Sequence, residues 1–211
     1  MTGTLLSLGH GYTARTLGRR LTAQGWRVIG TTRSDDAAAA IRAEGAEAVI
    51  WPPADPAALA AEATHILASA APGRDGVDPV LAVMGDALAA RGGDVAWAGY
   101  LSTTAVYGDR GGDWVDEDAD LTPSTPRGHA RVAAETAWRD LMARSGLPVH
   151  IFRLAGIYGP GRGPFQKVRD GKSRRIVKPG QVFGRIHADD IAAVLMASMA
   201  RPRPGAAYNV C

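Results

Sequence analysis

The glycine-containing turn "LGHGYTA" at residues 8–14 constrains the fold of this chain more than any other stretch. It reads Gly9-x-Gly11-x-x-Ala14, directly after the apolar run "TLLSL" and directly before a segment with helical periodicity. Two glycines allow a tight turn in which backbone amides approach a pyrophosphate, and a small third residue allows the helix to pack closely on the strand. At the first strand-to-helix turn of the chain, this pattern predicts a dinucleotide-binding α/β fold.

Short apolar runs alternate with alanine-rich helical segments along the chain, which is typical of a parallel sheet covered by helices on both faces. We expect strands at 4–8, 27–31, 47–51, 65–70, 95–103, 148–155 and 206–210. We expect helices at 13–24, 36–43, 56–63, 78–91, 126–145 and 188–200. Between the strand at 148–155 and the helix at 188–200 the alternation is less regular. We expect a short helix there near 165–170 and candidate strands near 174–177 and 182–187.

Composition favours one soluble domain that binds a small anionic ligand. The chain has 211 residues, of which 46% are hydrophobic, and a formal charge of +3. Only three of the 24 basic residues are lysines, and the arginines are dispersed, without a basic stripe interleaved with aromatics. This distribution argues against nucleic acid and suits a phosphate-bearing small molecule.

The N-terminal sequence and the lack of a long apolar run suggest a cytoplasmic location. The N-terminus has no basic region followed by a long apolar stretch, and no run of 18 apolar residues predicts a membrane span. The single cysteine, Cys211, excludes an intrachain disulfide and a thiolate metal site, and we expect no metal.

The residues after the second expected strand, "GTTRSDD", bear on the choice of cofactor. An NAD-selective site normally has Asp or Glu here for the ribose hydroxyls, whereas Arg33 and Ser34 suit a 2′-phosphate. We therefore predict NADP, with NAD as the less favoured alternative. Asp35 and Asp36 leave open that Arg33 is paired or solvated.

The stretch "STPRGHARVAAE", residues 124–135, places two arginines at the start of a helix. Thr125 suits the N-cap and Pro126 the first helical position, so Arg127 and Arg131 should share one face of the first two turns. The helix dipole is positive there, so both cations are unfavourable unless an anion lies opposite.

Four segments together resemble the extended and atypical short-chain dehydrogenase/reductase proteins, and most of all their NAD(P)-dependent epimerase/dehydratase group. These segments, which follow the family order over nearly the whole chain, are "YLSTTAVYGD", "WVDEDADLTPSTPRGHARVAAE", "FRLAGIYGPGR" and "RIHADDIA". The resemblance implies a Rossmann-type, three-layer, doubly wound parallel sheet with a small C-terminal substrate lobe. We accordingly divide the chain into an NAD(P)-binding domain at 1–156, a lobe segment at 157–187 and a returning helix and strand at 188–211. Because the lobe normally continues further, we expect a longer version of this chain.

The resemblance also implies a catalytic Ser or Thr, Tyr and Lys. Thr103 matches the first, while Arg127 stands at the Tyr position and Arg131 at the Lys position. A guanidinium remains protonated at any working pH, so Arg127 is excluded as the acid/base. It could instead bind a carboxylate, a phosphate or a developing oxyanion, while Arg131 could donate to ribose hydroxyls.

The remaining site predictions follow from the glycine turn, the strand ends and the resemblance. The predicted cofactor-binding residues are Gly9, His10, Gly11, Tyr12, Thr13, Ala14, Arg33, Ser34, Ala70, Ala71, Pro72 and Arg131. The predicted substrate-binding residues are Tyr107, Tyr158, Arg162 and Arg185, although the two tyrosines are as consistent with packing.

Three interpretations remain open on these grounds. The first is an NAD(P)-dependent epimerase/dehydratase-like oxidoreductase that acts on a small carbonyl, hydroxyl or sugar-type substrate through a non-standard active site. The second is a non-catalytic NADP-binding sensor or regulatory protein, and a truncated inactive domain is a third reading. A homodimer is possible through the helices at 78–91 and 126–145, whose faces would serve a monomer core equally well.

Overall fold

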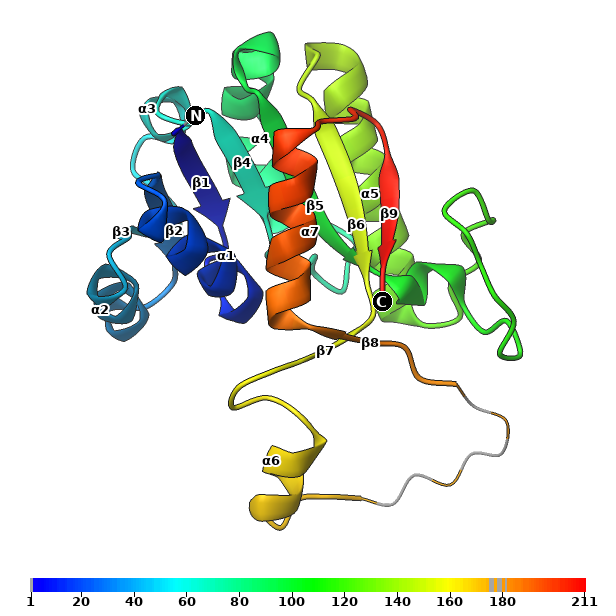
Figure 1. Ribbon diagram of the computed structural model, residues 1–211. Helices are drawn as coiled ribbons and strands as arrows, with labels where there is room; N and C mark the ends of the chain where they lie inside the picture. The colour runs from blue at the N-terminus through cyan, green and yellow to red at the C-terminus, as the bar shows by residue number, and fades with distance from the viewer. Residues whose placement is uncertain (1, 175–176, 178–179, 181) are drawn as a thin grey trace.

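The computed structural model describes residues 2–174, 177, 180 and 182–211, and its centre is a seven-stranded, all-parallel sheet (Figure 1). The strand order is β3-β2-β1-β4-β5-β6-β9. The strands are β1 (Thr4–Leu8), β2 (Arg27–Thr32), β3 (Glu47–Ile50), β4 (His65–Ala68), β5 (Trp97–Thr103), β6 (Val149–Leu154) and β9 (Ala207–Val210). The predicted doubly wound fold is confirmed.

Helices cover both faces of the sheet. One face carries α1 (Tyr12–Ala23), α2 (Asp35–Ala43) and α7 (Ala188–Ala200). The other carries α3 (Pro56–Ala61), α4 (Pro79–Arg91) and α5 (Pro126–Ser145). Figure 1 shows α7 in front of the sheet and α5 behind it.

Successive side chains along each central strand point to opposite faces of the sheet, so the hydrophobic core has two parts. Leu5 faces the α1 and α7 side while its neighbour Leu6 faces the α4 and α5 side, and both are fully buried. Strands buried on both faces are nearly continuous in apolar residues, which explains why the sequence revealed them as apolar runs.

The segment between β6 and α7 leaves the sheet. It contains β7 (Gly156–Tyr158), α6 (Pro164–Arg169) and β8 (Arg185–His187), and β7 pairs with β8 in parallel as a separate two-stranded sheet. Figure 1 shows α6 projecting away from the main sheet. The sequence did not predict β7, and the strand expected at 182–187 is limited to β8. The strand expected at 174–177 lies largely outside the described residues.

The parallel arrangement brings the loops that follow β1, β2, β4 and β5 to one edge of the sheet. The short 3₁₀ helix η2 (Thr104–Tyr107) continues directly from β5 at this edge. Within the described part of the chain, no helix has the length and apolar character that crossing a membrane requires.

Candidate functional site

The glycine turn between β1 and α1 is packed against the end of β4. Gly9 has φ +85°, and a Cβ on it would lie 2.9 Å from the backbone nitrogen of Ala70. The Ser69 hydroxyl donates to the Gly9 carbonyl, and the Gly9 amide donates to the Thr31 hydroxyl at 2.8 Å. The turn is thus held between β2 and β4 and requires glycine for both space and conformation.

The first turn of α1 presents backbone amides at this turn. The N-cap residue is Gly11, which has no side chain to occupy the N–H groups of Tyr12, Thr13 and Ala14. Ala14 is buried against the core, as the fingerprint predicts. These amides and the helix dipole fit a dinucleotide pyrophosphate, so this part of the chain has the features that the cofactor requires.

His10 differs from its neighbours because it faces the interior. Its amide donates to the Thr31 carbonyl at 2.9 Å, and its ring is wedged against Gly18 and Gly30, where an added Cβ would lie 2.8 Å and 2.6 Å from ring carbons. Burial lowers its pKa from 6.5 to about 4. The structure therefore packs His10 beneath the turn, and its predicted contact with the cofactor stays a prediction.

Arg33 and Ser34 follow β2 at the same edge. Arg33 is exposed and, within the described part of the chain, forms no ion pair with Asp35 or Asp36. The Ser34 hydroxyl caps α2 by accepting from the Ala37 amide at 3.4 Å. The guanidinium is thus available to an anion, while the hydroxyl already has a structural partner.

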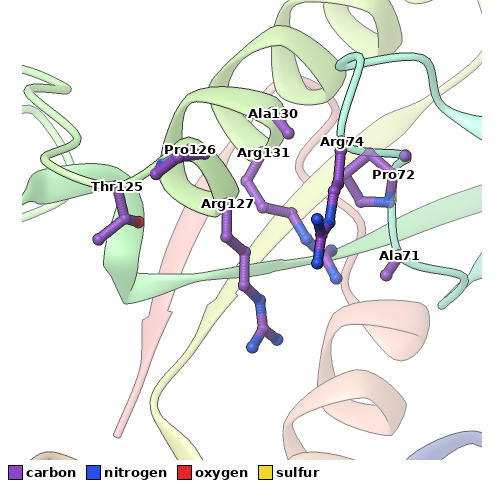
Figure 2. A pocket seen from close by; sticks show the side chains of 9 residues that line it. Ala71, Pro72, Arg74, Thr125, Pro126, Arg127, Ala130 and Arg131 are labelled. Atoms are coloured by element: carbon purple, nitrogen blue, oxygen red, sulfur yellow. The ribbon is translucent and has the colours of Figure 1, made fainter.

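A cavity of about 550 Å³ lies between the loop after β4 and the start of α5 (Figure 2). It combines the predicted residues Ala71 and Pro72 with Arg127 and Arg131, and it adds Arg74. The full lining set is Ala71, Pro72, Gly73, Arg74, Thr125, Pro126, Arg127, Ala130 and Arg131. Its charged groups are therefore three guanidiniums, with no acidic residue in the lining.

Helix α5 begins as the sequence predicts. The Thr125 hydroxyl accepts from the Gly128 amide at 3.1 Å, Pro126 is the first helical residue, and Gly146 ends the helix with φ 75°. A Cβ on Gly128 would lie 2.8 Å from the carbonyl oxygen of Ala105, so the helix approaches η2 more closely than other residues would allow. This contact fixes Arg127 and Arg131 relative to the end of β5.

The two arginines of α5 have different surroundings. Arg131 is 7% exposed and donates from Nη1 to the Leu101 carbonyl at 2.5 Å and to the Tyr100 hydroxyl at 3.3 Å. Its buried Nε has no partner among the described residues. Arg127 is exposed, and its side chain extends from the first turn toward the cavity (Figure 2).

Arg131 contacts a group of buried side chains through Tyr100. Tyr100 stacks on Trp138 with ring centroids 5.7 Å apart, and the Trp138 indole donates to Asp78 at 3.2 Å. Burial raises the pKa of Asp78, which also caps α4, and burial raises the pKa of Tyr100. The Arg131 charge opposes both shifts.

Thr103 ends β5 and is partly buried. Its hydroxyl caps η2 by accepting from the Ala105 amide at 3.3 Å. It does not belong to the lining set of the cavity, so its predicted catalytic role stays a prediction.

The four predicted substrate residues are separate from the cavity. Tyr107 is 2% exposed, and its hydroxyl bonds to Asn209 and Arg153 at 2.7 Å each. Its geometry is that of a packing residue, the alternative that the sequence left open. Tyr158 lies edge-on to His187 with centroids 5.0 Å apart.

The two remaining arginines of this set stack on aromatic rings. Arg162 lies 5.3 Å from the Tyr12 ring centroid, and Arg185 lies 5.4 Å from that of Phe183. Arg162 therefore lies against the first residue of α1, whereas Arg185 stacks within the lobe segment, and their predicted contacts with substrate stay predictions.

Arg74 is the charged residue of the cavity that was not predicted from the sequence. It follows β4 in the segment "SAAPGRD", where the predicted cofactor residues end at Pro72. An arginine two residues after a predicted cofactor contact was the available signal. Its relation to α5 depends on tertiary packing.

Comparisons with known proteins agree with this architecture. The model of the NAD dependent epimerase/dehydratase family matches residues 8–211. Protein YeeZ of Escherichia coli is 27% identical over 97% of this chain and 76% of its own length.

Two solved structures extend the comparison. A functionally unknown conserved protein from Silicibacter pomeroyi is 60% identical, with a TM-score of 0.90 over 99% of this chain and 72% of that one. UDP-glucuronic acid 4-epimerase from Bacillus cereus, in complex with UDP-glucuronic acid and NAD, shares the fold at 19% identity, with a TM-score of 0.79 over 100% of this chain and 77% of that one. The glycine turn, the parallel sheet and the family match over nearly the whole length lead to one conclusion: this chain belongs to the NAD dependent epimerase/dehydratase family.

Proposed function

We propose that this protein is an NADP-binding oxidoreductase or epimerase that acts on a small carbonyl, hydroxyl or sugar-type substrate and uses fixed arginine charges where its family uses Tyr and Lys. The observation that carries the proposal is the continuity of the site. The open amides of α1 and the close-packed Gly9 turn lead along one sheet edge to the cavity that Arg127 and Arg131 line.

The preference for NADP is supported by Arg33. Its exposed guanidinium has no acidic partner among the described residues, so a 2′-phosphate would gain a charge-assisted contact without displacing an existing ion pair. The ribose hydroxyls of NAD would gain no carboxylate acceptor from Arg33 or Ser34.

The chemistry open to the cavity is electrostatic. A bound nicotinamide would supply or accept hydride, while Arg127 would stabilise an oxyanion that develops on the substrate. Arg131 would orient the cofactor ribose from its buried position, and the proton would be exchanged with water. The proposed reaction therefore proceeds without a side-chain proton carrier in the cavity.

Titration of cofactor fluorescence with NADPH and NADH tests the cofactor assignment. We expect NADPH to bind at least about tenfold more tightly, a difference of about 1.4 kcal/mol. Arg33→Ser should remove this preference, whereas Arg42→Ser, which removes an exposed charge from α2, should retain it. Equal affinity for both cofactors in the wild-type protein would contradict the assignment.

Turnover tests the catalytic part. The protein with bound NADPH would be mixed with nucleotide sugars and small carbonyl compounds while the absorbance of the reduced cofactor is followed. A decrease supports an oxidoreductase. Tight binding with no absorbance change at any pH, together with no conversion of a nucleotide sugar to its epimer by the protein with bound NADP⁺, would overturn the catalytic proposal.

A second function, cofactor binding without hydride transfer in a sensor or regulatory protein, is favoured by the chemistry of the lining. The nine lining residues include three arginines and no His, Asp, Glu, Tyr, Cys or Lys. The paired substitution Arg127→Tyr and Arg131→Lys tests whether the arginines hold the cofactor. A sensor should retain NADPH affinity within about tenfold, whereas loss of binding would show that the arginines hold the cofactor itself.

A further inference from the structure

Arg74, Arg127 and Arg131 reach one cavity from two elements that are distant in the sequence. Figure 2 shows the three guanidinium groups directed into the same space, Arg74 from the loop after β4 and the other two from the first turns of α5. Three like charges around one cavity repel one another, and the positive end of the helix dipole adds to the repulsion.

None of these three groups has an ion-pair partner in the described part of the chain, and Asp78 acts on Arg131 only through space. Arg74 and Arg127 form no ion pair with any described residue, and Arg131 bonds only to the neutral oxygens of Leu101 and Tyr100. The buried Nε of Arg131 has no partner in the described part of the chain. An anion in the cavity would supply what this arrangement lacks.

The acidic residues nearest to the three arginines in the sequence have other hydrogen-bond or ion-pair partners. Asp78 accepts from the Val80 and Leu81 amides and from Trp138, at 2.8, 3.0 and 3.2 Å. Asp75 accepts from the Val77 amide at 3.1 Å. Glu135, one turn beyond Arg131 on α5, is paired with Arg153 at 3.0 Å.

The anionic parts of the dinucleotide have candidate partners other than the three arginines. Along the sheet edge, Arg33 follows β2, the open amides of α1 follow β1, and the three arginines follow β4 and β5. A 2′-phosphate and a pyrophosphate thus have their own candidate partners, Arg33 and the α1 amides, and the pyrophosphate turn adjoins the cavity because β1 and β4 are neighbours. An anion at the three arginines would then come from the second ligand.

We infer that Arg74, Arg127 and Arg131 form an oxyanion site for a carboxylate or phosphate group of the substrate, bound beside the dinucleotide. The inference names the substrate class for the proposed function: a small molecule that carries a carboxylate or a phosphate. Arg131 is the fixed member of the site because its guanidinium is anchored to β5, and the exposed Arg74 and Arg127 complete the site around the ligand.

Calorimetric titration of the full chain with oxalate and with inorganic phosphate, at constant ionic strength, tests the site. We expect saturable binding with one ligand per chain for at least one of the two, and the tighter one identifies the group. Arg127→Gln and Arg74→Gln should each weaken binding at least tenfold. Arg144→Gln, which removes an exposed charge from the last turn of the same helix, should change it less than twofold.

Absence of saturable binding for both probes would overturn the inference, as would an equal loss in Arg144→Gln. The exposed positions make misfolding of the variants easy to exclude by their unfolding midpoints. Repeating the titration with saturating NADPH separates the two proposals. Retained oxyanion binding supports a substrate site, and competition by NADPH would overturn it. Wild-type protein that binds oxyanion but no NADPH would overturn the proposed function while it upholds this site.

Discussion

Arg131 donates a 2.5 Å hydrogen bond to the carbonyl oxygen of Leu101, a residue of β5 two positions before Thr103. The bond joins α5 to the strand whose end carries the predicted substrate hydroxyl, so the guanidinium has a structural role whatever it binds. Arg131, which the sequence resemblance puts at the position of a lysine, is buried and anchored by the protein itself.

Replacing Arg131 with methionine should destabilise the fold. The substitution retains much of the aliphatic stem and leaves the Leu101 carbonyl without its buried donor, which should cost about 1–3 kcal/mol. Urea unfolding measures the difference. Arg144→Met, on the exposed face of the same helix, should change stability by less than about 0.5 kcal/mol, and equal losses in the two variants would contradict the anchoring role.

Gly9→Ala should lower NADPH affinity more than the same substitution at a glycine of similar φ outside the cofactor turn. Its Cβ would collide with the Ala70 backbone at 2.9 Å, and its φ of +85° is unfavourable for alanine. NADPH affinity should fall at least tenfold. Gly171→Ala has a similar φ of +65° with nothing within 4 Å, so it should cost about 1 kcal/mol of stability and leave affinity unchanged. Unchanged affinity in Gly9→Ala would contradict the assignment of the turn.

His10 should make the fold sensitive to acid. Burial lowers its pKa to about 4, with Glu44 opposing the shift and Arg15 and Arg19 adding to it. Between pH 4 and 6.5 the unfolded chain binds the proton and the native protein does not, so stability should fall by about 3 kcal/mol as the pH decreases through this window. His10→Gln should flatten this part of the profile of unfolding free energy against pH. An identical slope in the variant would show that other groups determine it.

The buried pair of Glu135 and Arg153 should matter more than an exposed pair. Its side chains are 2% and 4% exposed, and Glu135 also accepts from the Ser102 hydroxyl at 2.5 Å. Glu135→Gln removes one buried charge and leaves the other uncompensated, which should cost about 3–5 kcal/mol. Glu47→Gln, in the exposed pair with Arg27, should cost less than about 1 kcal/mol in the same denaturant titration. Similar losses at the two sites would contradict the importance of burial.

The sheet and its helices could be predicted because local signals agree with tertiary packing. Thr125 and Gly146 delimit α5 through capping chemistry that depends on neighbouring residues alone, and the apolar runs identify strands buried on both faces. The short β7 was not predicted because it forms by pairing with β8, which is distant in the sequence. Its own three residues carry no local strand pattern.

The site was predicted only in part, for a similar reason. The Gly9 turn and Arg127 belong to recognisable local motifs, whereas the convergence of Arg74 with them arises when β4 and β5 are placed side by side. The inward orientation of His10 was also beyond the motif, because it depends on the space left by Gly18 and Gly30 on two other elements.

A crystal structure of the protein soaked with NADPH and oxalate would show whether the dinucleotide and a separate oxyanion bind side by side. We expect pyrophosphate at the amides of Tyr12 and Thr13, the nicotinamide ribose beside Arg131, and oxalate in hydrogen-bond contact with Arg127 and Arg74. A dinucleotide whose own phosphates occupy the three arginines, or a cavity without oxalate beside bound NADPH, would contradict it.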